Sequence, residues 1–190
     1  MRNSREFQTE LTDGVLSLSP LRESDWDGLF AVASDRKIWE QHPSHDRWQE
    51  DVFRQFFDDA LASNGCMVVR DQESGNVIGS SRFFFGRSEP DEIEIGWTFL
   101  ARKYWGGTAN IRMKRLMVGY ALQHVHQVIF LVGHTNMRSR RAMEKIGARF
   151  TDRRYPVGAK DDKAHHVVFA MNEAEFLGSP LCAEQVGTIR

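Results

Sequence analysis

The sequence predicts an α/β fold in which a mixed, mostly antiparallel sheet is flanked by helices. Short runs rich in β-branched and aromatic residues, typical of strands, alternate with runs whose apolar residues recur every three or four positions. The second pattern indicates helices with one buried face. The connection through the central helix is long enough to cross over, so one parallel strand pair is expected there.

Composition limits the class of protein. At 190 residues the chain is expected to form one domain, 1–190, with a core of about 12–172 and a loosely packed tail at 173–190. The formal net charge of −1 argues against a nucleic-acid partner, and no apolar run is long enough for a membrane span. Two cysteines and a polar N-terminus fit a cytoplasmic protein. No metal site is expected, because no His, Cys and carboxylate set has metal-ligand spacing.

The first third of the chain is predicted to hold one strand and two helices. Residues 15–18 alternate in polarity and precede Pro20, as a short strand would. Ser24 is expected to cap a helix that has Asp25 and Asp27 in its first turn. A second helix at 48–62 has a strongly aromatic inner face, which is assigned to the core.

A hairpin is predicted next, with strands at 66–70 and 77–85 joined across Gly75 and Asn76. Cys66 could in principle be a nucleophile, but no His partner can be placed beside it. It is therefore interpreted as a buried strand thiol.

The C-terminal part contains a nearly all-apolar strand at 128–133, as expected for a strand covered on both faces. Asn136 is expected to cap the next helix, and Gly147 to end it in a left-handed conformation. Two further strands are predicted at 149–155 and 166–171.

The central stretch joins a strand at 92–100 to a helix through a loop that contains Gly106 and Gly107. Glycines let the backbone approach a ligand, and a helix N-terminus presents unpaired N–H groups with a partial positive charge. Five basic residues are expected to strengthen this positive field: Arg102, Lys103, Arg112, Lys114 and Arg115. We infer a pyrophosphate ligand. The alternative is an ordinary strand–loop–helix, since the spacing is not G-x-G-x-x-G.

Three stretches share their pattern with a known group of enzymes: residues 94–97 (EIGW), 104–123 and 136–148 (NMRSRRAMEKIGA). Through them the chain resembles the GNAT superfamily of N-acetyltransferases, and most closely its branch related to the ribosomal-protein N-terminal acetyltransferases. The first stretch is similar to the E-I-G-aromatic strand of that family. The third is similar to its N-x-x-S-x-x-x-x-E-K-x-G-F run and is the most specific of the three.

The resemblance implies the GNAT fold, with a splayed parallel strand pair, and acetyl-CoA as co-substrate without a metal. The loop departs from the family pattern, because Trp105 replaces Arg or Gln, Thr108 the first glycine and Asn110 the last. The loop is nevertheless expected to hold the CoA pyrophosphate, while strand backbone pairs with the pantetheine arm. The residues implied in acetyl-CoA binding are Trp97, Phe99, Leu100, Trp105, Gly106, Gly107, Thr108, Ala109, Asn110 and Asn136.

The same resemblance suggests two catalytic residues. Glu94 matches a general-base glutamate, with an exposed strand carboxylate as the alternative interpretation. Glu92 lies on the same strand face and could act as a relay or substitute. Ser139 matches a serine proposed to protonate the CoA thiolate, or else bonds the backbone of its own helix.

The leading hypothesis is an enzyme that transfers an acetyl group from acetyl-CoA to a primary amine of a peptide or protein N-terminus or of a small molecule. The alternative is a non-catalytic acyl-CoA-binding GNAT-fold sensor or scaffold. A small-amine acceptor such as an antibiotic is a third option, and Asp46, Glu50 and Asp51 hint at acidity near the acceptor. A homodimer is an open possibility.

Overall fold

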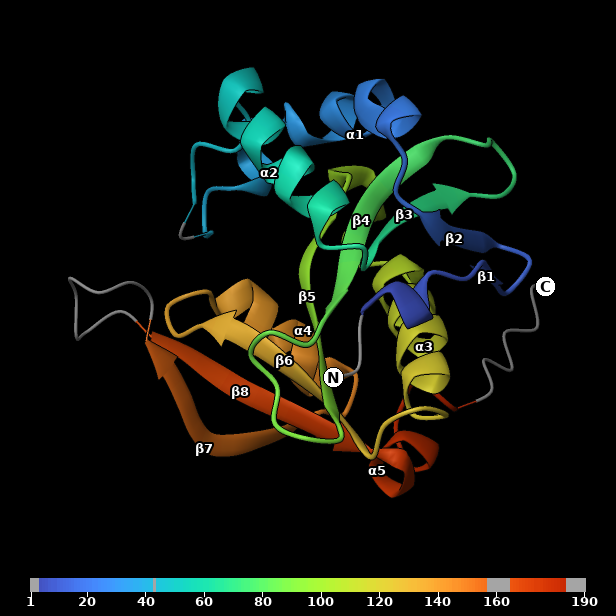
Figure 1. Cartoon of the computed structure of the whole chain (residues 1–190), viewed down its shortest axis with the longest axis vertical. Helices are drawn as coiled ribbons and strands as arrows, with labels where there is room; N and C mark the ends of the chain where they lie inside the picture. Colours follow the sequence, from blue (N-terminus) through green and yellow to red (C-terminus); the bar gives the residue numbers. More distant parts are fainter. Residues whose placement is uncertain (1–3, 43, 157–164, 184–190) are drawn as a thin grey trace.

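The computed structural model describes residues 4–42, 44–156 and 165–183, and it consists of an eight-stranded sheet with helices on both faces (Figure 1). The strands are β1 Leu11–Thr12, β2 Leu16–Pro20, β3 Cys66–Asp71, β4 Val77–Phe84, β5 Glu92–Leu100, β6 Gln127–Gly133, β7 Arg149–Pro156 and β8 His165–Asn172. The α-helices are α1 Trp26–Ala33, α2 Glu50–Ala62, α3 Ala109–Ala121, α4 Met137–Lys145 and α5 Glu173–Leu177. The short 3-10 turns are η1 Ser4–Phe7, η2 Glu23–Asp25, η3 Arg36–Ile38 and η4 Arg102–Tyr104.

The sheet has the strand order β1-β2-β3-β4-β5-β6-β8-β7, and β5–β6 is its parallel pair. All other neighbours are antiparallel. The predicted fold class is therefore confirmed, including the parallel crossover through α3. The predicted strand boundaries are confirmed to within two residues, whereas the two-residue β1 was not predicted.

The parallel pair is short. Its register runs only from Glu92 opposite Gln127 to Glu94 opposite Ile129. Beyond this point β5 continues to Leu100 and β6 to Gly133 without pairing to each other. The two strands therefore part in the middle of the sheet.

An irregularity in β5 accompanies this parting. The β4–β5 register shifts between Ser80 and Arg82, and Trp97, on the β5 side, has a φ of +50°. Such a left-handed residue in a strand marks a bulge, which bends the strand and increases its twist. The bulge lies where β5 leaves β6.

The helices divide the core between the two faces of the sheet. α3 and α4 cover one face over the large cluster that includes Met113, Met117 and Phe130. α1 and α2 cover the other face only over β3 to β5, through aromatic residues such as Phe53. The stripe on α2 is thus core, as predicted. On that second face, β6 and β8 carry a smaller cluster around Ile129 and Val168.

The predicted helix cap at Ser24 was wrong. Ser24 does not cap α1, because it lies inside η2, where Asp25 accepts a hydrogen bond from the Arg22 N–H at 2.8 Å. The tail was expected to pack loosely or fray. In its described part, Asn172 and Glu175 form a capping box for α5, and Leu181 is buried. The rest of the predicted tail, 184–190, lies outside the described residues.

None of the described helices has the length and apolar character that a bilayer span requires.

Candidate active site

The candidate site lies where β5 and β6 separate, and Glu94 is the last β5 residue paired to β6. Its side chain is 1% exposed and forms two hydrogen bonds with Arg87, from Nε to Oε2 at 3.0 Å and from Nη2 to Oε1 at 2.6 Å. Gly96 makes room for this carboxylate, since a Cβ there would lie 2.8 Å from Glu94 Oε1. The E-x-G spacing in residues 94–96 therefore has a steric reason.

Two opposing effects set the proton affinity of Glu94. Burial raises the pKa of its carboxyl, whereas the charge and hydrogen bonds of Arg87 lower it, and burial prevails. Arg87 also lies over the Trp97 ring, with its Cζ 4.7 Å from the ring centroid. A raised pKa makes this carboxylate, oriented by one partly exposed arginine, a better proton acceptor than an ordinary glutamate.

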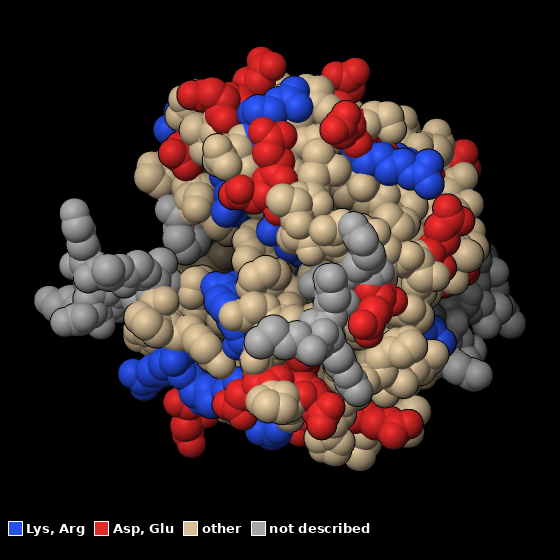
Figure 2. All heavy atoms as spheres, in the orientation of Figure 1, with Lys and Arg blue, Asp and Glu red and all other residues tan. Residues whose placement is uncertain are grey.

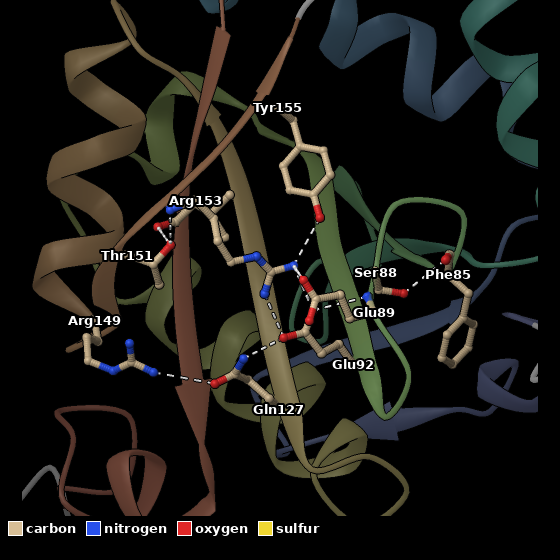
Figure 3. A network of polar contacts seen from close by, with 10 residues as sticks. Phe85, Ser88, Glu89, Glu92, Gln127, Arg149, Thr151, Arg153 and Tyr155 are labelled. Carbon is tan, nitrogen blue, oxygen red and sulfur yellow. Dashed lines mark hydrogen bonds and ion pairs between the residues drawn. The ribbon is translucent and has the colours of Figure 1, made fainter.

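Glu92 is placed differently, although it is also buried (Figure 3). Arg153 donates to both of its oxygens, at 2.7 and 3.0 Å, and Gln127 Nε2 donates at 2.6 Å. Burial acts to raise the pKa of Glu92, but these hydrogen bonds and one from the Glu89 N–H outweigh it, so the pKa lies below its usual value. Glu92 is thus an occupied anchor between β5, β6 and β7, and it is poorly suited to act as a base.

The loop before α3 has the backbone expected of an anion site. Gly106 adopts a φ of +75°, which favours glycine. Among the described residues, the N–H groups of Gly106, Gly107 and Thr108 have no hydrogen-bond acceptor. Thr108 occupies the N-cap position of α3, which begins at Ala109, and its side chain does not cap the helix. Several N–H donors are therefore available at one helix N-terminus.

Trp105 links this loop to the end of β5. Its Nε1 donates to the Leu100 carbonyl at 2.8 Å, and its ring carries the Arg138 guanidinium, with Cζ 4.3 Å from the centroid. Arg138 itself donates to the Ile38 carbonyl at 2.7 Å. The indole that replaces the family's Arg or Gln thus connects β5 with the start of α4 and with η3.

The positive field predicted around this loop is weaker than expected. Arg102 is paired with Asp35, and Arg112 with Asp13 at 2.8 Å. Lys114 points into the protein and is 2% exposed, so it does not add to the field at the surface. The remaining two, Lys103 and Arg115, are exposed.

Lys114 was predicted to lie at the surface near the loop, but it is buried in the core. Its Nζ lies 2.9 Å from Thr98 Oγ1 and 3.4 Å from Ser81 Oγ, and 5.4 Å from the Phe130 centroid. Burial lowers its pKa to about 7. A signal was available: Lys114 precedes the buried Val118 by four residues, so it belongs to the apolar face of α3.

α4 begins at Met137, shortly after β6 ends at Gly133. Asn136 caps the helix as predicted, its Oδ1 accepting from the Ser139 N–H at 3.1 Å. The Ser139 hydroxyl makes no hydrogen bond to any described residue, so it does not bond the backbone of its own helix. Gly147 ends the helix with a φ of +81°, also as predicted.

Cys66 is not a nucleophile candidate. Its thiol is 3% exposed under α2, and burial raises its pKa to about 11. A protonated, enclosed thiol is inert, which confirms its interpretation as a buried strand residue.

Comparisons with known proteins agree with this geometry. Residues 16–149 match the family model described as an acetyltransferase (GNAT) domain. A search of curated proteins found no match.

Solved structures were compared as well. The chain is similar to a probable acetyltransferase of the GNAT family from Chromobacterium violaceum, with a TM-score of 0.77 and 20% identity over 89% of this chain and 88% of that one. It is also similar to Mycobacterium smegmatis RimJ in complex with CoA-disulfide, with a TM-score of 0.69 and 14% identity over 96% and 95%. A third is spermidine N-acetyltransferase from Vibrio cholerae in complex with CoA and spermine, with a TM-score of 0.61 and 15% identity over 87% and 99%. At these identities the similarity shows a shared fold.

Proposed function

The chain belongs to the acetyltransferase (GNAT) domain family, and on that premise we propose that it transfers an acetyl group from acetyl-CoA to a primary amine. The acceptor is the N-terminus of a peptide or protein, or a small molecule, and it attacks directly while both substrates are bound. The branch related to the ribosomal-protein N-terminal acetyltransferases is part of this proposal, supported by the pattern of residues 136–148.

One observation carries the proposal: β5 and β6 part directly after Glu94, and the loop of unbonded N–H groups precedes the helix that connects them. The N–H groups of Gly106, Gly107 and Thr108 suit the two phosphates of CoA. Between the parted strands, the backbone of β5 from Trp97 to Leu100 lacks a β6 partner and can pair with the amides of the pantetheine arm. The Leu100 carbonyl is the exception, because Trp105 already occupies it.

The reaction forms an N–C bond and breaks the C–S bond of the thioester. We assign the amine proton to Glu94, directly or through a water, because its carboxyl is buried, has a raised pKa and ends the paired part of β5. Arg87 keeps the carboxylate oriented. The departing thiolate takes a proton, and Ser139 is the proposed donor because its hydroxyl is uncommitted at the start of α4.

A thiol-release assay tests the proposal. Acetyl-CoA is titrated calorimetrically into the protein, and CoA release is then followed across a panel of peptides and small amines. Saturable binding and amine-dependent release are expected. Binding without release for any amine would favour the alternative, a sensor or scaffold, whereas absence of binding would reject both.

A further inference from the structure

Three arginines and two histidines gather near α2 on one face of the sheet, and we call them the cationic cluster after the arginines. Burial lowers the pKa of His42 to about 3, so this histidine is neutral. They come from the segment between η3 and α2, from β4 and the turn after it, and from β8. The members are His42, Arg47, Arg82, Arg87 and His166. Figure 2 shows basic side chains within the depression between the half that contains α1 and α2 and the half that contains β7 and β8.

Two aromatic rings hold the arginines of the cluster together. Arg47 and Arg82 both lie over Phe56, with Cζ 4.4 and 5.5 Å from the ring centroid. Arg82 and Arg87 both lie over Trp97, at 4.8 and 4.7 Å. The three guanidinium groups therefore form one continuous row that ends at the Arg87–Glu94 pair.

Arg82 is the least satisfied member of the row. It is 5% exposed, and its Nε and Nη2 are buried without a hydrogen-bond partner among the described residues. It also forms no ion pair with any described carboxylate. Burying a guanidinium with unpaired N–H groups is costly, so these two nitrogens favour a ligand that brings acceptor oxygens.

The neighbours of Arg82 supply no acceptor for its unpaired nitrogens. Arg47 has no ion pair with a described carboxylate, and its Nη1 lies 3.4 Å from His42 Nε2. Burial, and then the charge of Arg82, lowers the pKa of Arg47 to about 10. His166 places a buried Nδ1 without a described partner on the same side, and burial, followed by the charge of Arg87, lowers its pKa.

Carboxylates compensate the row only in part, because none of those described forms an ion pair with Arg47 or Arg82. Glu94 is bound by Arg87, and Glu92 by Arg153. Asp59 lies near enough to favour the charged forms of Arg47 and Arg82, but its own side chain is exposed to solvent. Of the three acidic residues that the sequence suggested near α2, Glu50 and Asp51 are exposed on the first turn of that helix. The half-buried Asp46 favours the charged form of Arg47.

We infer, building on the acetyl transfer proposed above, that the acceptor amine also carries an anionic group, a carboxylate or a phosphate, which Arg82 and Arg47 bind. A guanidinium offers paired N–H donors that match both anions. The row of arginines ends at Glu94. If Arg82 binds the anionic group of a small molecule, the amine of that molecule can therefore lie near Glu94, the proposed base. Polyamines and aminoglycosides, which carry only positive charges, are disfavoured by repulsion.

The first test uses acceptors in matched pairs that differ only in the anion. Phenylalanine is compared with phenethylamine, and O-phosphoethanolamine with ethanolamine, by the kcat/KM of CoA release. The anionic member of at least one pair should be preferred by about tenfold or more, because a site with buried donors rejects an analogue that leaves them unpaired. The pair with the larger ratio distinguishes carboxylate from phosphate. Equal or reversed preference overturns this inference and leaves acetyl transfer intact.

The second test uses Arg82→Gln and Arg47→Gln. Each should lower kcat/KM for the anionic member of a pair much more than for the member without the anion, while calorimetric acetyl-CoA affinity stays within about twofold. Arg54→Gln is the control, because Arg54 stacks on Trp26, 3.2 Å from its centroid, and lies outside the cluster. A parallel loss of acetyl-CoA affinity would assign the cluster to the CoA phosphates and overturn the inference.

Two outcomes need a separate measurement. If Arg82→Gln does not melt cooperatively, Arg47→Gln carries the test alone, since Arg47 lies in the segment before α2 and outside the sheet. If no amine supports CoA release, the proposed function fails, and calorimetry of the anionic amines without acetyl-CoA still tests the cluster. Saturable binding to the parent that Arg82→Gln weakens by about tenfold would support the anion site, and absent binding would reject it.

Discussion

Glu94 and Glu92 show how two carboxylates of one strand acquire different chemistry. Both are buried on the same face of β5. Glu92 accepts from side chains of two other strands and from a turn N–H, and its pKa is lowered. Glu94 has one partner, Arg87, which comes from the turn after β4, and its pKa is raised by burial. Of the two, Glu94 is therefore the better proton acceptor.

Replacing Glu94 by Gln preserves shape and removes the base. Turnover should fall by at least about a hundredfold, the lower range for general-base catalysis. The defect should shrink as the pH rises towards the pKa of the acceptor amine, because free amine then forms without help. Binding of acetyl-CoA should remain. The measurement is a pH–rate profile of parent and variant with one confirmed acceptor. Superimposed profiles would remove Glu94 from the proton route.

The burial of Lys114 is expected to make the free energy of unfolding depend on pH. Its pKa is lowered to about 7 in the folded protein, whereas an unfolded lysine titrates near 10.4. Between these values the unfolded state binds one more proton, so this residue makes stability rise with pH, by at most ~1.4 kcal/mol per pH unit. Below about pH 7 Lys114 is charged in both the folded and the unfolded state, and the full cost of burying its ammonium group remains.

Lys114→Met should remove that cost. The variant should be more stable than the parent at pH 6 to 7, and the difference should decline towards pH 10. Urea unfolding at several pH values measures it. Lys103→Met is the control, because Lys103 is exposed and should leave the pH dependence unchanged. Parallel stability curves for parent and Lys114→Met would mean that Lys114 keeps an ordinary pKa.

At the scale of the element, the N-terminus of α3 combines a loop with free N–H groups and a helix without a side-chain cap. Gly107 lies within that loop and has space beside it, since the nearest atom to an added Cβ would be the Tyr104 carbonyl oxygen at 3.8 Å. A substitution there can therefore change charge without disturbing the fold.

Gly107→Asp should weaken acetyl-CoA binding by about tenfold or more, because a carboxylate would stand where the pyrophosphate is proposed to bind. Gly107→Ala adds a Cβ without charge and should retain most of the affinity. Calorimetric titration of both variants separates charge from volume. If the Asp variant binds as tightly as the Ala variant, the phosphates lie elsewhere.

Local patterns allowed most elements to be predicted, because periodicity and caps act within a few residues. The strand pattern of β5, the Asn136 cap and the left-handed Gly147 all depend on near neighbours. Arg102 and Arg112 were misjudged because their acid partners, Asp35 and Asp13, are distant in sequence. Charge pairing of this kind is decided by the fold.

The candidate site, too, was predictable only in part. The position of Glu94 followed from its motif, whereas its pairing with Arg87 did not, since the turn after β4 has no pattern that places it. Arg82 reads as one polar residue in a strand, and its burial between Phe56 and Trp97 depends on α2 and on the bulge in β5. The sequence therefore pointed to the candidate residue Glu94, but not to the side chains that surround it.

For the whole molecule, the parting of β5 and β6 divides the sheet into two halves. On one face of the sheet, α3 and α4 pack against both of these halves. Between the strands themselves, pairing is confined to the positions from Glu92 to Glu94 on β5. A ligand inserted beyond Glu94 would contact both halves at once and would bind only the folded chain.

Acetyl-CoA should therefore raise the melting temperature. At a concentration of about 100 Kd, a ligand specific for the native state contributes ~2.7 kcal/mol. For a domain of this size, each kcal/mol shifts Tm by about 2–4 °C, so a rise of roughly 5–11 °C is expected. The shift should grow with the logarithm of concentration and should be much smaller with adenosine, which lacks the pyrophosphate and the pantetheine arm. Thermal melts across a concentration series test this, and an unchanged Tm at millimolar acetyl-CoA would contradict a ligand site between the two halves of the sheet.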